Sequence, residues 1–309
     1  MKENKQIDIF YDLYDKACLF YHHKLQLDYL SCIIRVGTDL TRSLNDTGLE
    51  LEDMEELEFL YDQFSLHRFT NEEVRIAMEL IVIKGLKDNG SYVLDLMTPD
   101  AIGYLFAFLI SKMASNHATV LDVCTKTGNL ISTIHNFTTQ EFTLYGIESD
   151  PLLVELTKVI CDLQNTQITI FQNSCMDPLP IQADFIIGDL GKINQQTEMV
   201  PQQIILHFLE NLNDKGFFIY LIDNDFFNRE GAGSFKTSLQ GSLLGLIVLP
   251  DTMFQDNSVG KSILIGSKYQ TPEGELCMIN MPSLTDSERL NHMIQQVEEW
   301  TIKWKGMIQ

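Results

Sequence analysis

The sequence predicts a doubly wound α/β domain with a mostly parallel, seven-stranded sheet, preceded by an N-terminal helical domain. Two observations support this fold class. From residue 118 onward, short apolar runs alternate with helical segments, which is the pattern of successive β–α units. The apolar runs are nearly continuous, as in Phe217 to Ile222, which is typical of strands buried on both faces of a parallel sheet. We expect the helical domain to cover residues 1–90 and the α/β domain to cover residues 91–309.

The first 90 residues carry helical patterns. Aromatic and aliphatic residues recur at helical spacing over Ile7 to Asp28, and the segment from Glu50 to Phe64 is acidic and amphipathic. The segment from Asn71 to Lys87 follows Thr70, which together with Glu73 forms the sequence pattern of a capping box. We therefore expect helices and no strands in this part of the chain.

The α/β domain is expected to contain seven strands with helices between them. The predicted strands cover residues 118–123, 142–148, 167–172, 183–189, 216–222, 243–249 and 262–268. The predicted helices cover residues 129–137, 151–165, 200–213 and 232–240, and a helical tail covers Leu284 to Lys305.

The turn after the first predicted strand is the strongest indication of a ligand site. The strand carries Asp122 near its end, and a tight polar turn leads to a helix that begins at Asn129. Open α/β sheets bind ligands at such strand–turn–helix junctions, where backbone amides meet an anionic group such as a carboxylate. The second predicted strand ends at Glu148, whose carboxylate can accept hydrogen bonds from two vicinal ribose hydroxyls. This pattern predicts a nucleoside cofactor without a polyphosphate.

The turn also resembles a known family. The sequence Asp122-Val-Cys-Thr-Lys-Thr-Gly-Asn129 is similar to the Asp-Pro-Ala-Cys-Gly-Thr-Gly-Gly/Asn loop of N6-adenine DNA methyltransferases. The resemblance is strongest to the methylase subunits of type I restriction systems and their short bacterial relatives. It implies a class I, Rossmann-like methyltransferase fold and S-adenosylmethionine as cofactor. Lys126 stands where the family has glycine, a residue that permits unusual φ angles. The residues implied to hold the cofactor in this loop and the next strand are Asp122, Thr125, Thr127, Gly128, Asn129 and Glu148.

Further segments extend the resemblance over about residues 70–270. The segment Leu96 to Tyr104 looks like the family's Thr-Pro segment, which implies that Thr98 lies near the methionine end of the cofactor. A plain helix N-terminus explains this segment equally well. Asn173 falls where the family commonly contacts the adenine amino group, although its side chain can equally cap the end of the preceding strand.

The catalytic motif is the point where the sequence departs from the family. The family carries Asn/Asp-Pro-Pro-Tyr/Phe at the end of the fourth strand, where it holds the target amino group and stacks on the flipped base. Here the strand ends in Asp189-Leu190-Gly191-Lys192. Asp189 keeps a polar acceptor and is the candidate catalytic residue. Both prolines and the aromatic ring are absent, and such a ring is worth ~1–3 kcal/mol per stacked base.

Charge and composition restrict the partners and the location. The chain has 22 basic and 43 acidic residues, a net charge of −21, which opposes the approach of phosphates. We expect the isolated chain to bind nucleic acid weakly, and a partner protein subunit to supply any strong DNA contact. No apolar run reaches the ~18 residues that span a bilayer, and Met1 to Asp8 does not resemble a secretory signal. The sequence therefore predicts a cytoplasmic protein with no membrane partner. The six cysteines show no CxxC spacing, so no metal site is predicted.

Two function classes remain open. The first is an S-adenosylmethionine-dependent methyltransferase of the N6-adenine DNA methylase family, with its target amine held near Asp189. The second is a catalytically degenerate binding or regulatory protein that keeps the methylase fold. The substitutions at Lys126 and at Leu190 to Lys192 favour the second class, and the acids Asp122, Glu148 and Asp189 favour the first. A measurement of S-adenosylmethionine binding discriminates best between them.

Overall fold

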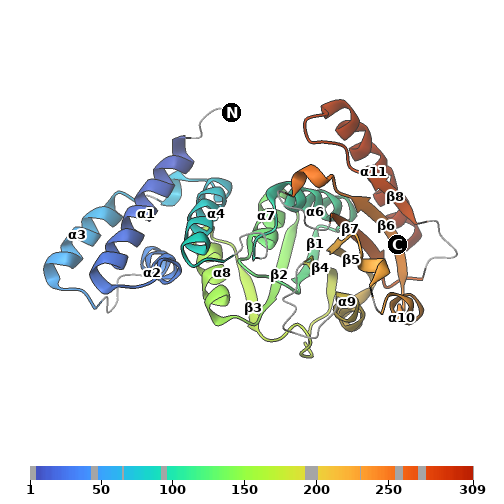
Figure 1. The fold of residues 1–309 in the computed structure, drawn as a ribbon, viewed down its shortest axis with the longest axis horizontal. Helices are drawn as coiled ribbons and strands as arrows, with labels where there is room; N and C mark the ends of the chain where they lie inside the picture. Colours follow the sequence, from blue (N-terminus) through green and yellow to red (C-terminus); the bar gives the residue numbers. More distant parts are fainter. Residues whose placement is uncertain are drawn as a thin grey trace. The chain divides into compact units, whose positions relative to one another are not determined.

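The computed structural model describes residues 5–42, 48–64, 66–91, 96–191, 201–229, 231–254, 260–270 and 276–308. These residues form an α/β structure with one eight-stranded sheet and a helical N-terminal region (Figure 1). Their contacts divide the chain into two compact units. The first unit joins residues 1–103 with 125–137 and 148–172, and the second joins 104–124, 138–147 and 173–309.

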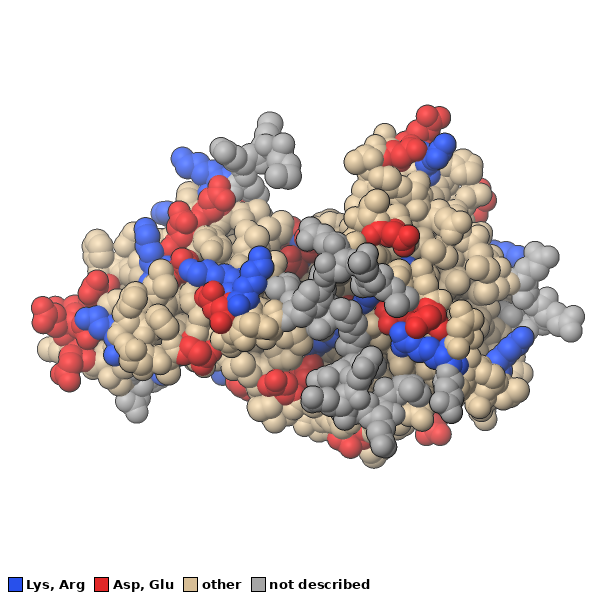
Figure 2. All heavy atoms as spheres, viewed as in Figure 1, with Lys and Arg blue, Asp and Glu red and all other residues tan. Residues whose placement is uncertain are grey.

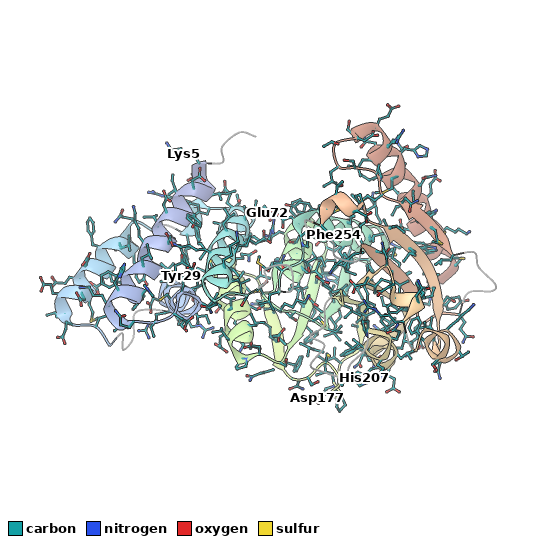
Figure 3. All side chains as sticks on the ribbon, viewed as in Figure 1. Lys5, Tyr29, Glu72, Asp177, His207 and Phe254 are labelled. Atoms are coloured by element: carbon teal, nitrogen blue, oxygen red, sulfur yellow. The ribbon has the colours of Figure 1, made fainter. Side chains whose placement is uncertain are left out.

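The first unit is built around the N-terminal helices. Helix α1 (Lys5–Leu25) packs against α2 (Tyr29–Arg42), α3 (Leu51–Asp62) and α4 (Asn71–Asp88). Their shared core is apolar and rich in aromatic rings, and Tyr29, labelled in Figure 3, belongs to it. Between residues 5 and 91 the described part of the chain contains helices and no strand, as the sequence predicts.

Helix α4 begins with the predicted capping box. The Thr70 hydroxyl accepts a hydrogen bond from the Glu73 amide at 3.2 Å, and the Glu73 carboxylate accepts one from the Thr70 amide at 2.9 Å. Two amides that have no partner within the helix are thereby satisfied. This part of the prediction is confirmed.

Acidic side chains gather over α3 (Figure 2). The acids of this helix are Glu52, Asp53, Glu55, Glu56, Glu58 and Asp62. One of them, Asp53, pairs with Lys24 of α1. A surface of this sign repels phosphates, so α3 does not offer a site for a nucleic-acid backbone.

The sheet carries its strands in the order β3-β2-β1-β4-β5-β7-β6-β8. Strand β1 pairs in parallel with β2 and β4, β4 with β5, and β6 with β8, whereas β7 is antiparallel to both of its neighbours. The sheet is therefore mostly parallel, and its interior strands are almost wholly buried. The strands are β1 (His117–Asp122), β2 (Glu141–Glu148), β3 (Ile168–Gln172), β4 (Ala183–Asp189), β5 (Leu212–Asp223), β6 (Ser242–Val248), β7 (Lys261–Ser267) and β8 (Cys277–Asn280).

The helices of the α/β part include the five predicted ones, α7 to α11, in the predicted order, and α6, which is not among the predicted helices. They are α6 (Asp100–Met113), α7 (Asn129–Phe137), α8 (Pro151–Leu163), α9 (Pro201–Phe208), α10 (Ala232–Ser238) and α11 (Ser287–Ile308). In the second unit, α11 lies against β6, where a Cβ on Gly245 would approach the Trp304 ring to 2.8 Å. An ion pair between Lys112 and Glu298 ties α11 to α6.

Several elements differ from the sequence-based expectation. Helix α2 (Tyr29–Arg42) is a separate helix that the sequence analysis did not predict. Helix α9 ends at Phe208, five residues before the predicted 213, and a 3₁₀ turn over Leu209–Asn211 follows it. At the end of this turn, the Asn211 side chain donates to the carbonyls of Leu179 and Ile181, both at 2.8 Å. Strand β5 consequently begins at Leu212.

A further difference is an eighth strand. Strand β8 adds to the seven predicted strands and lies at the edge of the sheet. It has only four residues, too few to show a period in the sequence. No helix among the described residues is both long enough and apolar enough to cross a membrane.

Candidate functional site

The loop that leads into α7 has an unusual backbone. The Gly128 amide donates to the Thr125 carbonyl at 2.8 Å, which closes a tight turn. Within it, Lys126 has a φ of +53° and Gly128 a φ of +75°. Lys126 therefore adopts the left-handed conformation that the resemblance associates with glycine, at a cost of roughly 1 kcal/mol or more. The substitution at this position does not remove the backbone shape.

Helix α8 fixes this turn from one side. The Thr157 hydroxyl donates to the Lys126 carbonyl at 3.1 Å, and Thr157 is fully buried. A Cβ on Gly128 would lie only 2.3 Å from the Thr157 Cγ2. Gly128 is thus required both by its positive φ and by the close approach of α8.

Glu148 fixes the turn from the other side. One carboxylate oxygen, Oε2, accepts a hydrogen bond from the Lys126 amide at 2.9 Å. The other, Oε1, accepts from the amides of Ser149 and Asp150 at 2.8 and 2.9 Å. Since each carboxylate oxygen has about two lone-pair sites, Oε2 retains room for one further donor. Sequence reasoning assigned Glu148 to a ligand, and the structure adds a role in holding the loop.

Asn129, the first residue of α7, binds the segment that precedes α6. Its side chain donates to the Thr98 carbonyl at 2.5 Å and accepts from the Thr98 amide at 3.1 Å. The Thr127 hydroxyl donates to the Leu96 carbonyl at 3.0 Å. The structure thus brings Thr98, Thr127 and Asn129 together, and their contacts hold two chain segments side by side. Direct contact of these residues with a cofactor stays a prediction.

A buried ion-pair cluster lies next to Asn129. Arg75 of α4, 1% exposed, contacts three carboxylates, those of Glu72, Glu79 and Asp100, at 2.6, 2.6 and 2.8 Å. Glu72 is labelled on α4 in Figure 3. Glu79 also accepts a hydrogen bond from Asn129 at 3.4 Å. A small pocket is lined in part by Arg75, Glu79, Thr127 and Asn129. The sequence analysis did not find this cluster, because only the fold brings Asp100, the first residue of α6, to Arg75 of α4.

One guanidinium cannot neutralise three carboxylates, and Glu79 is the most deeply buried of the three. Burial raises the pKa of Glu79 to about 8, against the opposing charge of Arg75 and with a further rise from Asp100. Because the folded state binds this proton more tightly than the unfolded state, the contribution of Glu79 to stability is complete below the ordinary glutamate pKa of 4.5 and is lost as the pH rises through about 8.

We therefore expect the free energy of unfolding of the wild type to fall relative to that of Glu79→Gln between about pH 5 and pH 8. The slope is at most ~1.4 kcal/mol per pH unit. Urea unfolding at several pH values measures it. Glu58→Gln, which changes an exposed acid of α3, should follow the wild type. A pH-independent difference between wild type and Glu79→Gln contradicts the prediction.

The remaining predicted site residues lie in the second unit. Asp122, fully buried at the end of β1, accepts a hydrogen bond from the Cys124 amide at 3.1 Å. Asn173 follows β3 and is half-buried. Asp189 ends β4, is 1% exposed, and accepts a hydrogen bond from the Gly191 amide at 3.1 Å. Lys192 lies outside the described residues.

Asp189 has a partner that the sequence analysis missed. The Lys261 ammonium, at the first residue of β7, lies 3.7 Å from the Asp189 carboxylate. Leu190, where the family has proline, is buried, and its amide donates to the Leu221 carbonyl of β5 at 2.9 Å. The only sequence signal for Lys261 is a lysine at the head of an otherwise apolar strand, which is not specific.

Comparison with known proteins gives related chains along the whole length. Residues 8–86 match the family model described as the YtxK N-terminal helical domain. The uncharacterized protein YtxK of Bacillus subtilis is 25% identical over 323 residues, which cover 96% of this chain and 97% of that protein.

Two solved structures share the architecture. A protein of Listeria monocytogenes, described as a candidate class I S-adenosylmethionine-dependent methyltransferase, is 25% identical with a TM-score of 0.84, over 96% of this chain and 99% of that one. The methyltransferase subunit of a type I restriction-modification system from Streptococcus thermophilus is 13% identical with a TM-score of 0.61, over 96% and 79% of the two chains. The chain has the class I methyltransferase fold. The predicted fold class is confirmed, with β8 as an addition.

Proposed function

We propose that the protein is an S-adenosylmethionine-dependent methyltransferase that binds its cofactor at the loop before α7 and at Glu148. The observation that carries the proposal is the joint geometry of these two parts. Lys126 and Gly128 keep the left-handed backbone angles, and Glu148 holds the loop while its Oε2 retains acceptor capacity. The likeness to the Listeria protein supports the same activity.

The residues present fit this cofactor in part. Glu148 can accept one ribose hydroxyl at Oε2, whereas Oε1 already accepts two amides. Thr98, Thr127 and Asn129 keep the adjoining segments in place through their mutual contacts. The cofactor supplies an electrophilic methyl group when bound. The contributions of Asp122, Thr125 and Asn173 to its binding belong to the proposal.

Titration calorimetry with S-adenosylmethionine tests the proposal. We expect the wild type to bind, and Glu148→Ala to bind with ~1–3 kcal/mol less free energy, because a hydroxyl and the Lys126 amide both lose their acceptor. This loss corresponds to about 5- to 150-fold in affinity. The matched control is Glu155→Ala, which removes an exposed acid of α8 in the same unit. No binding by the wild type, or equal affinity of wild type and Glu148→Ala, refutes the proposal.

For the methyl acceptor and the binding partners we propose only a general class. The N6-adenine specificity of the resembling family requires an aromatic ring, and the described residues Leu190 and Gly191 do not supply one. With a net charge of −21, the isolated chain is expected to bind DNA weakly. If the acceptor is a nucleic acid, we propose that a partner subunit provides the contacts to it.

A second candidate function is favoured by the contact between Asp189 and Lys261. A carboxylate that is already paired with an internal cation is a poor acceptor for a substrate amine. This supports a binding or regulatory protein that keeps the cofactor fold without methyl transfer. This alternative is supported if the protein binds S-adenosylmethionine but transfers no methyl group to the nucleic acids tested, with or without a partner subunit.

A further inference from the structure

Because β7 is antiparallel to β5, its first residue, Lys261, lies beside the C-terminal ends of β4 and β5. In the pairing of β5 with β7, Lys261 lies opposite Asp223. The Lys261 side chain is 9% exposed and that of Asp189 2% exposed. At 3.7 Å from the carboxylate, the ammonium is within ion-pair distance but beyond a direct hydrogen bond. Lys261 is therefore a buried cation held against the candidate catalytic acid.

The chain around Asp189 is shaped to receive this ammonium. A Cβ on Gly191 would lie 1.9 Å from the Lys261 Nζ and 2.8 Å from its Cε, so a larger residue at 191 would displace the ammonium from this position. The Gly191 amide donates to Asp189 Oδ1, which orients the carboxylate. The site around the Lys261 ammonium thus has the buried Asp189 carboxylate on one side and Gly191, which has no side chain, on another.

A second carboxylate extends the favourable charge. Asp223 pairs with Arg229 at 2.6 Å. Burial raises the pKa of Asp223, while Arg229 and Lys261 lower it, so Lys261 acts on both carboxylates. Burying an ammonium is costly unless an opposite charge lies close to it, and Asp189 is the carboxylate within ion-pair distance, while Asp223, which is paired with Arg229, adds a longer-range attraction. The site around the Lys261 ammonium therefore suits a compact alkylammonium group better than a planar base.

We propose that Lys261 occupies the acceptor position of this site, with its ammonium in the place that a substrate amino group would take against Asp189. The residues around it form a binding site for a primary alkylammonium, which an external amine can enter only when Lys261 is withdrawn or removed. The inference rests on the proposed function only in assigning the end of β4 to the acceptor.

Lys261→Ala tests this directly. The substitution removes the side-chain atoms beyond Cβ, and propylammonium replaces those atoms one for one. The second probe is the peptide Gly-Lys-Gly, acetylated and amidated so that its only amine is on the lysine side chain. Binding of both probes is measured by calorimetry without cofactor, at constant ionic strength. We expect both to bind Lys261→Ala at least ~10-fold more tightly than wild type, and Lys261→Ala/Asp189→Asn to bind neither.

The two probes separate an acceptor position from a structural ion pair. A sealed cavity admits propylammonium but excludes the peptide, so binding of propylammonium alone overturns the proposal, as does binding of neither. Lys112→Ala, which breaks the exposed pair with Glu298, is the control and should bind neither probe. If Lys261→Ala does not stay folded, the same probes are compared by how far each promotes its refolding from urea. Because no cofactor is present, failure here is distinct from a failure of S-adenosylmethionine binding.

Discussion

Arg75→Met is expected to lower the free energy of unfolding by about 3–5 kcal/mol at pH 8. Arg75 is the cation at the centre of the buried cluster, and its removal leaves Glu72, Glu79 and Asp100 facing one another. Methionine keeps most of the volume, so the loss arises from uncompensated charge and not from a cavity. Urea unfolding monitored by circular dichroism gives the value.

Two further measurements make the Arg75 prediction specific. The loss should shrink towards pH 5, because carboxylates without a cation bind protons and thereby remove their repulsion. Arg42→Met is the matched control, since Arg42 pairs with Asp162 on the surface with 55% of its side chain exposed. Such exposed pairs contribute about 0–1 kcal/mol. An equal effect of the two substitutions would show that the cluster does not stabilise the first unit.

Gly128→Ala is expected to destabilise the protein by about 2–4 kcal/mol. The positive φ of Gly128 costs an alanine roughly 1 kcal/mol, and the collision with the Thr157 Cγ2 adds roughly 1–3 kcal/mol of overpacking. Gly233→Ala is the control, because a Cβ there meets nothing within 4 Å and alanine favours the α10 helix.

A double substitution separates the two causes at Gly128. Thr157→Ser removes Cγ2 and keeps the hydroxyl that donates to the Lys126 carbonyl. Gly128→Ala should therefore cost less in the Thr157→Ser background, with the backbone cost remaining. A cost that is the same in both backgrounds would show that the close approach of α8 does not matter. Thermal unfolding of the four proteins provides the comparison.

Local patterns in the sequence were sufficient for much of the fold. The strand that ends at Asp189 ends at the predicted residue, and the strand that ends at Asp122 ends one residue before the predicted 123. The Thr70 capping box forms as its spacing predicts. These features depend on neighbours a few residues apart, so the sequence contains the information they need. The turn that contains Gly128, between strand and helix, is likewise predicted from its local sequence.

Other features depend on contacts between segments far apart in the chain. The helical segment that follows α9 stops at Asn211, whose side chain binds the carbonyls of Leu179 and Ile181, and no pattern around Asn211 indicates this contact. Lys126 stands where the resembling family has glycine, and lysine intrinsically prefers negative φ. In the structure, Thr157 and Glu148 hold its backbone in the left-handed region. Tertiary contacts here override a local preference.

The sequence by itself determined the fold class, the strand–turn–helix junction and the acids at the ends of its strands. Only the tertiary structure decided what surrounds those acids. The Glu148 carboxylate holds the Lys126 amide, and Asp189 faces Lys261 because β7 runs antiparallel beside β5. The physical reason is that a buried charge requires partners in space, and the strand order and direction of the sheet, not distance along the chain, determine which partners it meets.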